Sequence, residues 1–239
     1  MDVVISVGGS VLAPSRGPDR VSKWTEAIEA LVEDGHRVGV VVGGGAIARD
    51  YIDSARALGA DEIALDDLGI AITRINARLV IAALGDAVHP EPALDYAAAK
   101  THLRSADVCV MGGTSPGHTT DAVAAALAEF LGADLLVLAT SVAGVFDADP
   151  NQTGSASQYD SLSAAELVEL IAANEMNAGS RAPVDLLAAK LIDRARLRTI
   201  VLDGTDPRRT VRAVTAGDHD GTDIVPTESG DSPNPTTDR

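Results

Sequence analysis

The sequence predicts an α/β fold in which a mainly parallel sheet carries helices on both faces. Short apolar runs that are typical of buried strands alternate along the chain with stretches whose apolar residues recur at helical spacing. The strand-like runs are continuously apolar, which favours parallel strands buried on both sides. Glycine-rich loops follow three of these runs. Because such sheets bind ligands beyond the carboxyl ends of their strands, we expect the site at those loops.

The first unit is a strand over Val3–Val7 that ends in the tight turn Gly8-Gly9-Ser10. The backbone donors of this glycine pair suit a phosphate. The pair matches neither GxGxxG nor GxxxxGK[ST], so a plain turn is the alternative. Apolar residues at helical spacing predict a following helix that ends near Gly35: Val21, Trp24, Ile28, Leu31 and Val32.

The second unit is a strand over Val38–Val42, the loop Gly43–Gly45 and a helix over Ala46–Leu58. Its inward face is predicted to hold Ile47, Tyr51, Ile52, Ala55 and Leu58. Three consecutive glycines are expected where a ligand touches main chain. Arg49 lies in the first helical turn, where a cation opposes the helix dipole. It either forms a structural salt bridge or binds an anion at the same glycines, and we favour the anion.

A long helix is expected from Asp66 to Leu84, with Asp66 near its N-cap. Asp66 either only caps this helix or accepts ribose hydroxyls of a ligand. The segment from Ala93 to Leu103 is expected to be a short helix or a loop.

The most informative stretch runs from the strand Val108–Met111 through the loop Gly112–Asp121 into a helix ending at Leu131. The loop combines glycines with hydroxyl side chains and leads into a helix N-terminus, which attracts anions. It is longer than a generic connection. An ordinary capped connection is the alternative to a phosphate or carboxylate site.

The remaining strands are expected over Leu135–Ala139, Thr199–Leu202 and Gly221–Val225. The segment Thr140–Pro150 contains Phe146 and could line a base and ribose pocket. Predicted helices are one with a Ser163/Glu166 capping box that ends at Ala173, one over Val184–Ala195 carrying Lys190, and one that Pro207 opens. From Pro226 onward the composition predicts a disordered acidic tail.

Composition narrows the function classes. The chain has 239 residues and a formal charge of −16, and its only lysines are Lys23, Lys100 and Lys190. Such a surface repels nucleic acid and suits molar salt, as in a halophile. The apolar runs are too short to cross a membrane and the start lacks a signal peptide's basic region, so we expect a cytoplasmic protein. The single Cys109 is expected to pack in the core, and the scattered histidines support no metal site.

The order of the motifs along the chain resembles that of the amino acid kinase family. These motifs are the glycine loops, Asp66 with Gly69-Ile70 and Thr73-Arg74, the Gly112–Asp121 loop and the Thr140–Pro150 segment. Within that family the chain is most similar to archaeal-type uridylate kinases, over Val3 to about Val225. The resemblance implies an αβα sandwich that phosphorylates UMP with ATP and Mg²⁺ in pyrimidine nucleotide biosynthesis, commonly as a homohexamer. The acceptor is already an oxyanion, so no general base is needed.

The resemblance also implies roles for residues. Around the ATP phosphates it places Gly9, Ser10, Gly45 and Arg49, and around adenine and ribose it places Thr140, Ser141, Phe146 and Asp149. For UMP it implies Gly44, Asp66, Thr114, Ser115, Pro116, Gly117, His118, Thr119 and Thr120. Arg49 and Lys190 are the catalytic candidates. The single domain 1–225 would consist of a UMP-side lobe, 1–131, and an ATP-side lobe, 132–225, followed by the tail 226–239.

Two departures from the family pattern stand out. Many members carry a lysine where this chain has Ser6, and some carry an aspartate at the position of Ser141. Lys190 corresponds to a position that often reaches the transferred phosphoryl group, with a surface lysine as the alternative. Other acceptors on the same fold, isopentenyl phosphate or N-acetylglutamate, remain open, as does a nucleotide-binding oligomer without turnover.

Overall fold

The computed structural model describes residues 1–12, 18–148, 150, 155–175 and 184–227. Its strands form one sheet in the order β3-β2-β1-β4-β6-β7-β5. Their bounds are β1 Asp2–Val7, β2 Arg37–Val42, β3 Val108–Met111, β4 Leu135–Thr140, β5 Ser161–Ser163, β6 Thr199–Asp203 and β7 Thr222–Val225. Among these strands only the β6–β7 pair is antiparallel. The predicted, mainly parallel sheet is therefore confirmed.

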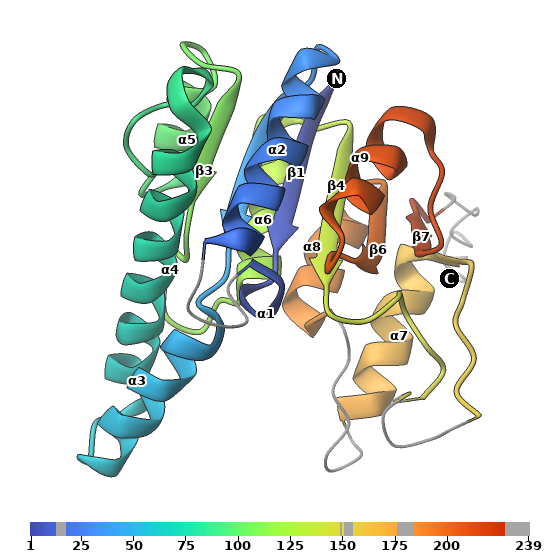
Figure 1. Cartoon of the computed structure of the whole chain (residues 1–239). Helices are drawn as coiled ribbons and strands as arrows, with labels where there is room; N and C mark the ends of the chain where they lie inside the picture. Colours follow the sequence, from blue (N-terminus) through green and yellow to red (C-terminus); the bar gives the residue numbers. More distant parts are fainter. Residues whose placement is uncertain (13–17, 149, 151–154, 176–183, 228–239) are drawn as a thin grey trace, which may run out of the picture.

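Helices cover both faces of this sheet (Figure 1). Their bounds are α1 Gly9–Leu12, α2 Asp19–Glu33, α3 Gly45–Ala57, α4 Glu62–Leu84, α5 Tyr96–His102, α6 Thr120–Leu131, α7 Ala164–Glu175, α8 Leu186–Ala195 and α9 Pro207–Ala216, with the short 3₁₀ helix η1 at Gly85–Ala87. No helix in the described part of the chain is both long enough and apolar enough to span a membrane.

Alternating side chains of the central strand β1 divide the core into two layers. Val3, Ile5 and Val7 pack in a cluster that includes Trp24 of α2. Val4 points the other way, into a cluster that includes Leu127 of α6. Each face of the sheet therefore has its own buried layer, as an αβα sandwich requires.

The register of the three central strands brings the predicted site segments to one edge. Val7 pairs with Val42 of β2 and with Ala139 of β4. The next amides continue these ladders, since Gly8 N donates to Ala139 O at 3.0 Å and Gly43 N donates to Val7 O at 3.0 Å. The glycine loops and Thr140 thus start side by side.

Some predicted boundaries are wrong. Gly9 begins the short helix α1 instead of completing a tight turn, and α4 begins at Glu62, well before Asp66. The N-cap of α4 is Asp61, whose carboxylate accepts from Ala64 N at 2.9 Å. Asp66 is therefore not a cap. The capping box of α7 is confirmed, because Glu166 N donates to Ser163 Oγ at 3.2 Å and Ser163 N donates to Glu166 Oε2 at 2.7 Å.

The inward face predicted for α3 is wrong at two positions. Tyr51 is 57% exposed and Leu58 is 89% exposed. The buried residues of this helix are Gly45 and Ala48, at its beginning. Figure 1 shows the reason, since α3 and the first part of α4 project beyond the carboxyl edge of the sheet, where α4 covers one side of α3.

Candidate active site

Two glycine loops touch each other at the carboxyl edge of the sheet, backbone against backbone. A Cβ atom added to Gly9 would lie 2.0 Å from Gly45 N, and one added to Gly43 would lie 2.3 Å from Gly9 N. Gly45 also has φ +69°, a conformation that side chains disfavour. Glycine is therefore required at these positions. The contact places the start of α1 directly beside the start of α3.

Helix α4 fixes the second and third glycine loops through buried polar side chains. Asn76 Nδ2 donates to Gly43 O at 2.8 Å and to Gly44 O at 3.2 Å. Thr73 Oγ1 accepts from Gly113 N at 2.7 Å, and a Cβ on Gly112 would lie 2.4 Å from this oxygen. Both residues are nearly inaccessible to solvent. They position two loops from one rigid helix.

A cavity of about 270 Å³ lies beside these loops. Its walls come from the start of α3, from α4 and from the loop before α6: Gly44, Gly45, Ala48, Arg49, Ile52, Asp66, Gly69, Ile70, Thr73, Gly113, Ser115, His118 and Thr120. Seven of the residues proposed from the sequence thus line one cavity: Gly44, Gly45, Arg49, Asp66, Ser115, His118 and Thr120. Apolar Ile52 and Ile70 offer a surface for a ring, and the N-terminus of α3 offers backbone donors to an anion.

Arg49 supplies the cationic wall of this cavity. It is exposed, and within the described residues it forms no ion pair. The salt-bridge alternative for Arg49 finds no partner in that part of the chain. A cation near the N-terminus of α3 gains from an anion bound at the same backbone amides.

Two side-chain contacts hold the end of the loop before α6. Asp66 Oδ2 accepts from Gly117 N at 2.7 Å. Thr119 caps α6, since its Oγ1 accepts from Ala122 N at 3.1 Å, and the same hydroxyl donates to Asp185, the N-cap of α8. Thr114, Pro116, Gly117 and Thr119 belong to this loop without lining the cavity.

A polar cluster lies between β1 and α6, at the position of the departure from the family pattern. Ser6 is buried and donates through Oγ to Asp121 Oδ1 at 2.7 Å. The pKa of Asp121 is raised from 3.8 to about 6, because burial and, to a smaller extent, repulsion from Asp185 together outweigh the lowering by the Ser6 hydrogen bond. The hydroxyl group at the Ser6 position thus faces the carboxyl group of Asp121.

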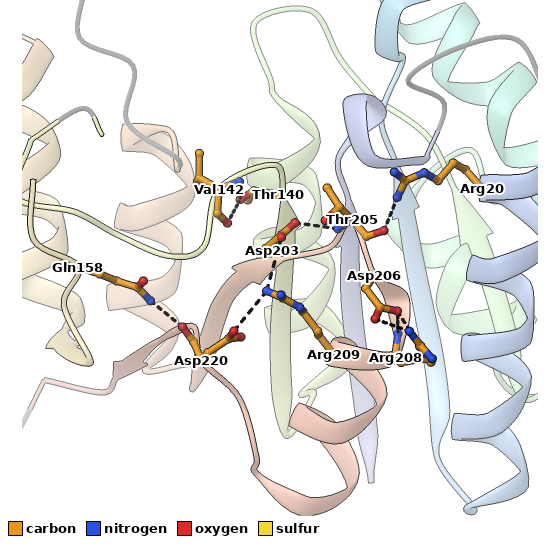
Figure 2. A network of polar contacts seen from close by, with 10 residues as sticks. All are labelled: Arg20, Thr140, Val142, Gln158, Asp203, Thr205, Asp206, Arg208, Arg209 and Asp220. Atoms are coloured by element: carbon orange, nitrogen blue, oxygen red, sulfur yellow. Dashed lines mark hydrogen bonds and ion pairs between the residues drawn. The ribbon is translucent and has the colours of Figure 1, made fainter. Parts of the chain in front are cut away.

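The other predicted segment, Thr140–Pro150, begins at the end of β4, beside the end of β6. Thr140 pairs with Asp203 in the sheet, and its Oγ1 accepts from Val142 N at 3.1 Å (Figure 2). Ser141 is exposed. Phe146 is half-buried, and its main chain forms an isolated antiparallel β-bridge with Gln158. Asp149 lies outside the described residues.

Ser10 and Lys190 are exposed on α1 and α8. Neither lines the cavity, and the described residues give Lys190 no ion pair. A larger surface groove of about 830 Å³ lies between α2 and α9, and none of the residues predicted for the site lines it. The contacts between glycine loops therefore locate the site better than cavity size does.

Comparisons with known proteins identify the family of the chain. Residues 1–203 match the model of the amino acid kinase family. Uridylate kinases of Halobacterium salinarum and Halorubrum lacusprofundi are each 60% identical, covering 95% and 96% of this chain and 94% and 95% of their own. The crystal structure of uridylate kinase from Archaeoglobus fulgidus superposes with a TM-score of 0.84 at 44% identity, covering 94% of this chain and 100% of that one.

Proposed function

The chain belongs to the amino acid kinase family, and from that premise we propose that it transfers the terminal phosphoryl group of ATP to UMP, giving UDP and ADP. The observation that carries the proposal is the contact of Gly9 with Gly45 beside the cavity that Asp66 and His118 line. Such a contact would bring the terminal phosphate of ATP close to the phosphate of UMP. The proposed acceptor is also the one in the names of relatives that match nearly full length.

Each loop then has a role. Gly9, Ser10 and Gly45 hold the ATP phosphates through backbone N–H groups, and Thr140, Ser141, Phe146 and Asp149 hold adenine and ribose. UMP occupies the cavity, with its ribose at Asp66 and its phosphate toward Gly44 and the loop Thr114–Thr120. On this assignment residues 1–131 form the UMP-side lobe, residues 132–225 form the ATP-side lobe, and the tail starts at residue 226.

Catalysis is positioning and charge neutralisation. A phosphate oxygen of UMP attacks the terminal phosphorus of ATP, and the bond to the bridging oxygen of ADP breaks. The attacking oxygen is already ionised, so no side chain has to remove a proton. Arg49 and the amides at the start of α3 neutralise charge on the transferred group. Lys190 is a further candidate for this task.

Magnesium fits this site as a companion of the phosphates. The described residues contain no group of three or more His, Cys, Asp or Glu side chains that could hold a metal. We assign Mg²⁺ to the ATP phosphates, where it supplies charge neutralisation. The backbone amides of the glycine loops would hold the phosphates that carry the ion.

Association between copies is also proposed, up to the homohexamer that the family resemblance implies. The observation behind it is the set of exposed apolar side chains on α3 and α4: Tyr51, Leu58, Ile63, Ile75 and Leu79. Light scattering in molar KCl measures the assembled mass. We place the enzyme in the cytoplasm, where its product UDP serves pyrimidine nucleotide synthesis.

The test is a coupled assay of ADP release in molar KCl with Mg·ATP and a panel of acceptors: UMP, CMP, isopentenyl phosphate and N-acetylglutamate. Turnover should be fastest with UMP. Turnover with isopentenyl phosphate or N-acetylglutamate but not with UMP would overturn the assignment. Absence of turnover with every acceptor, in protein that binds ATP, would favour a nucleotide-binding oligomer.

A further inference from the structure

Hydrogen bonds hold the segment Thr140–Asp147 from two sides. On the first side is the loop that follows β6. Gly204 N donates to Thr140 O at 2.9 Å, and Asp203 Oδ1 accepts from Thr205 N at 2.8 Å, which fixes the shape of this loop. The position of the start of the segment therefore depends on the position of Asp203 and its neighbours.

On the second side are Thr222 and Gln158. Val145 N donates to Thr222 Oγ1 at 2.9 Å, and this hydroxyl donates to Tyr159 O at 2.6 Å. A Cβ on Gly144 would lie 2.5 Å from Thr222 Oγ1 and 2.7 Å from Gln158 Nε2, so the segment fits closely against both. Gln158 in turn donates to Asp220 O at 2.7 Å. The position of the end of the segment therefore depends on the turn that contains Asp220.

Arg209 joins the two sides. Its Nη1 lies 3.5 Å from Asp203 Oδ2 and 3.3 Å from Asp220 Oδ2. Figure 2 shows this side chain reaching from α9 between the two aspartates. The Arg209 side chain is 32% exposed and that of Asp203 is 22% exposed, so solvent screens the first pair only in part. Without the guanidinium, two carboxylates would face each other across the gap.

We propose that Arg209 is a positioning residue for ATP. It sets the spacing between the loop after β6 and the Asp220 turn, and through them the shape of Thr140–Asp147. This inference rests on the proposed function, which assigns that segment to the base and ribose. Arg209 touches neither nucleotide nor reacting atoms, and it acts through its two aspartates.

The neighbouring Arg208 is a matched control. In the described structure it pairs with Asp206, the N-cap of its own helix, and its side chain is 86% exposed. Replacing Arg208 removes the same charge from the same helical turn and leaves both sides of the segment joined. Comparing the two variants therefore separates the effect of losing the Asp203–Arg209–Asp220 contacts from the effect of losing one positive charge.

The experiment measures Mg·ATP affinity by equilibrium titration in molar KCl without an acceptor, at a temperature well below each variant's unfolding midpoint. Arg209→Ala should weaken ATP binding by about three- to tenfold, while Arg208→Ala stays within about twofold of wild type. Arg209→Lys should be intermediate, because lysine keeps the positive charge on a shorter and more flexible side chain than that of arginine. In turnover assays Arg209→Ala should raise KM for ATP and leave KM for UMP within about twofold.

A double variant that also neutralises one of the two aspartates makes the test specific. Asp220→Asn in the Arg209→Ala background removes the facing charges and retains the main-chain carbonyl that binds Gln158. This double variant should recover part of the lost ATP affinity. The inference is overturned if Arg209→Ala binds ATP like wild type, if Arg208→Ala loses as much affinity, or if the double variant recovers none. The binding arm uses no acceptor, so wild-type protein that binds ATP and ignores UMP would reject the proposed acceptor without affecting this test.

Discussion

The proposed acceptor half and donor half of the site are built by different means. The two halves meet where backbone atoms of Gly9, Gly43 and Gly45 touch, and on the acceptor side helix α4 holds the loops through Thr73 and Asn76. On the donor side, the segment after β4 depends on main-chain and side-chain contacts with separate parts of the chain. The difference teaches that the function of a glycine loop can be recognised from the loop's own sequence. The residues that hold the segment after β4 lie elsewhere in the chain and cannot be recognised in this way.

The largest expected effect comes from the backbone contact. Gly9→Ala places a Cβ 2.0 Å from Gly45 N, so the two loops must separate. We expect kcat/KM to fall by about 10³-fold for both substrates, because the reacting groups lose their alignment. Steady-state kinetics on the purified variant measure this. The control is Gly39→Ala in β2, where the nearest atoms are 3.4 Å away. An equal loss in the control would mean that the contact between loops has no special role.

Arg49→Ala should lower kcat by about 10²-fold and leave KM for both substrates within about threefold, since the charge acts on the transferred group. Arg56→Ala is the matched control on the same helix. Arg56 pairs with Asp53 and Glu62 at the far end of α3. Single-turnover kinetics separate the chemical step from product release. An unchanged rate in Arg49→Ala would remove this residue from the transition state.

Asp66→Ala should act on the acceptor half alone, raising KM for UMP by about tenfold. The carboxylate both faces the cavity and orders Gly117 through a hydrogen bond of 2.7 Å. The exposed neighbour Asp67 provides the control Asp67→Ala. A rise in KM for ATP with no rise for UMP would contradict the placement of UMP in this cavity.

The smallest effect on turnover is expected for Asp121→Asn, which instead changes the pH dependence of stability. Burial raises the pKa of Asp121 from 3.8 to about 6, so the folded chain binds this proton more tightly than the unfolded chain. The contribution of Asp121 to the free energy of unfolding should therefore fall as the pH rises from about 4 to about 6, and level off above that. In the variant this contribution disappears, and stability at pH 7 should rise by about 1–3 kcal/mol relative to wild type.

Urea denaturation at several pH values measures that slope, with Asp67→Asn as an exposed control. A wild-type curve that is flat between pH 4 and pH 6, or a variant that keeps the wild-type slope, would show that the Asp121 carboxyl group does not control this region. Ser6 still donates to the amide oxygen of the variant, so the polar contact between β1 and α6 is retained.

Much of the fold follows from local pattern. The continuous apolar runs from Val3 and from Leu135 predicted strands that the sheet contains. Strand β5 was missed because Ser161–Ser163 has a single apolar residue and pairs only with β7. Tyr51 and Leu58 followed helical spacing, yet α3 projects past the sheet and leaves them in solvent. Periodicity reports that a face is apolar and does not report whether anything covers it.

The site divides in the same way. Glycine runs and Arg49 were visible in the sequence because each signals its chemistry locally. Thr73 was visible in the sequence only through the family resemblance, and Asn76 was missed. Both are buried polar residues in an apolar helical stripe, three positions apart, which was the available signal for their positioning role. Arg209 gave no such signal. It acts by joining Asp203 to Asp220, and only the folded chain brings those residues together.

The contact between Gly9 and Gly45 has a consequence for how such an enzyme can change its substrate. Among the described residues, the atoms nearest to a Cβ added at Gly9 are main-chain atoms of Gly44 and Gly45. On the proposed mechanism, the main chain therefore sets the distance over which a phosphoryl group travels. The walls of the acceptor cavity, by contrast, are side chains such as Asp66, Ile70 and His118. Substitutions in those walls can alter which molecule is accepted without altering the length of the transfer. Substrate choice and transfer geometry are therefore free to evolve separately.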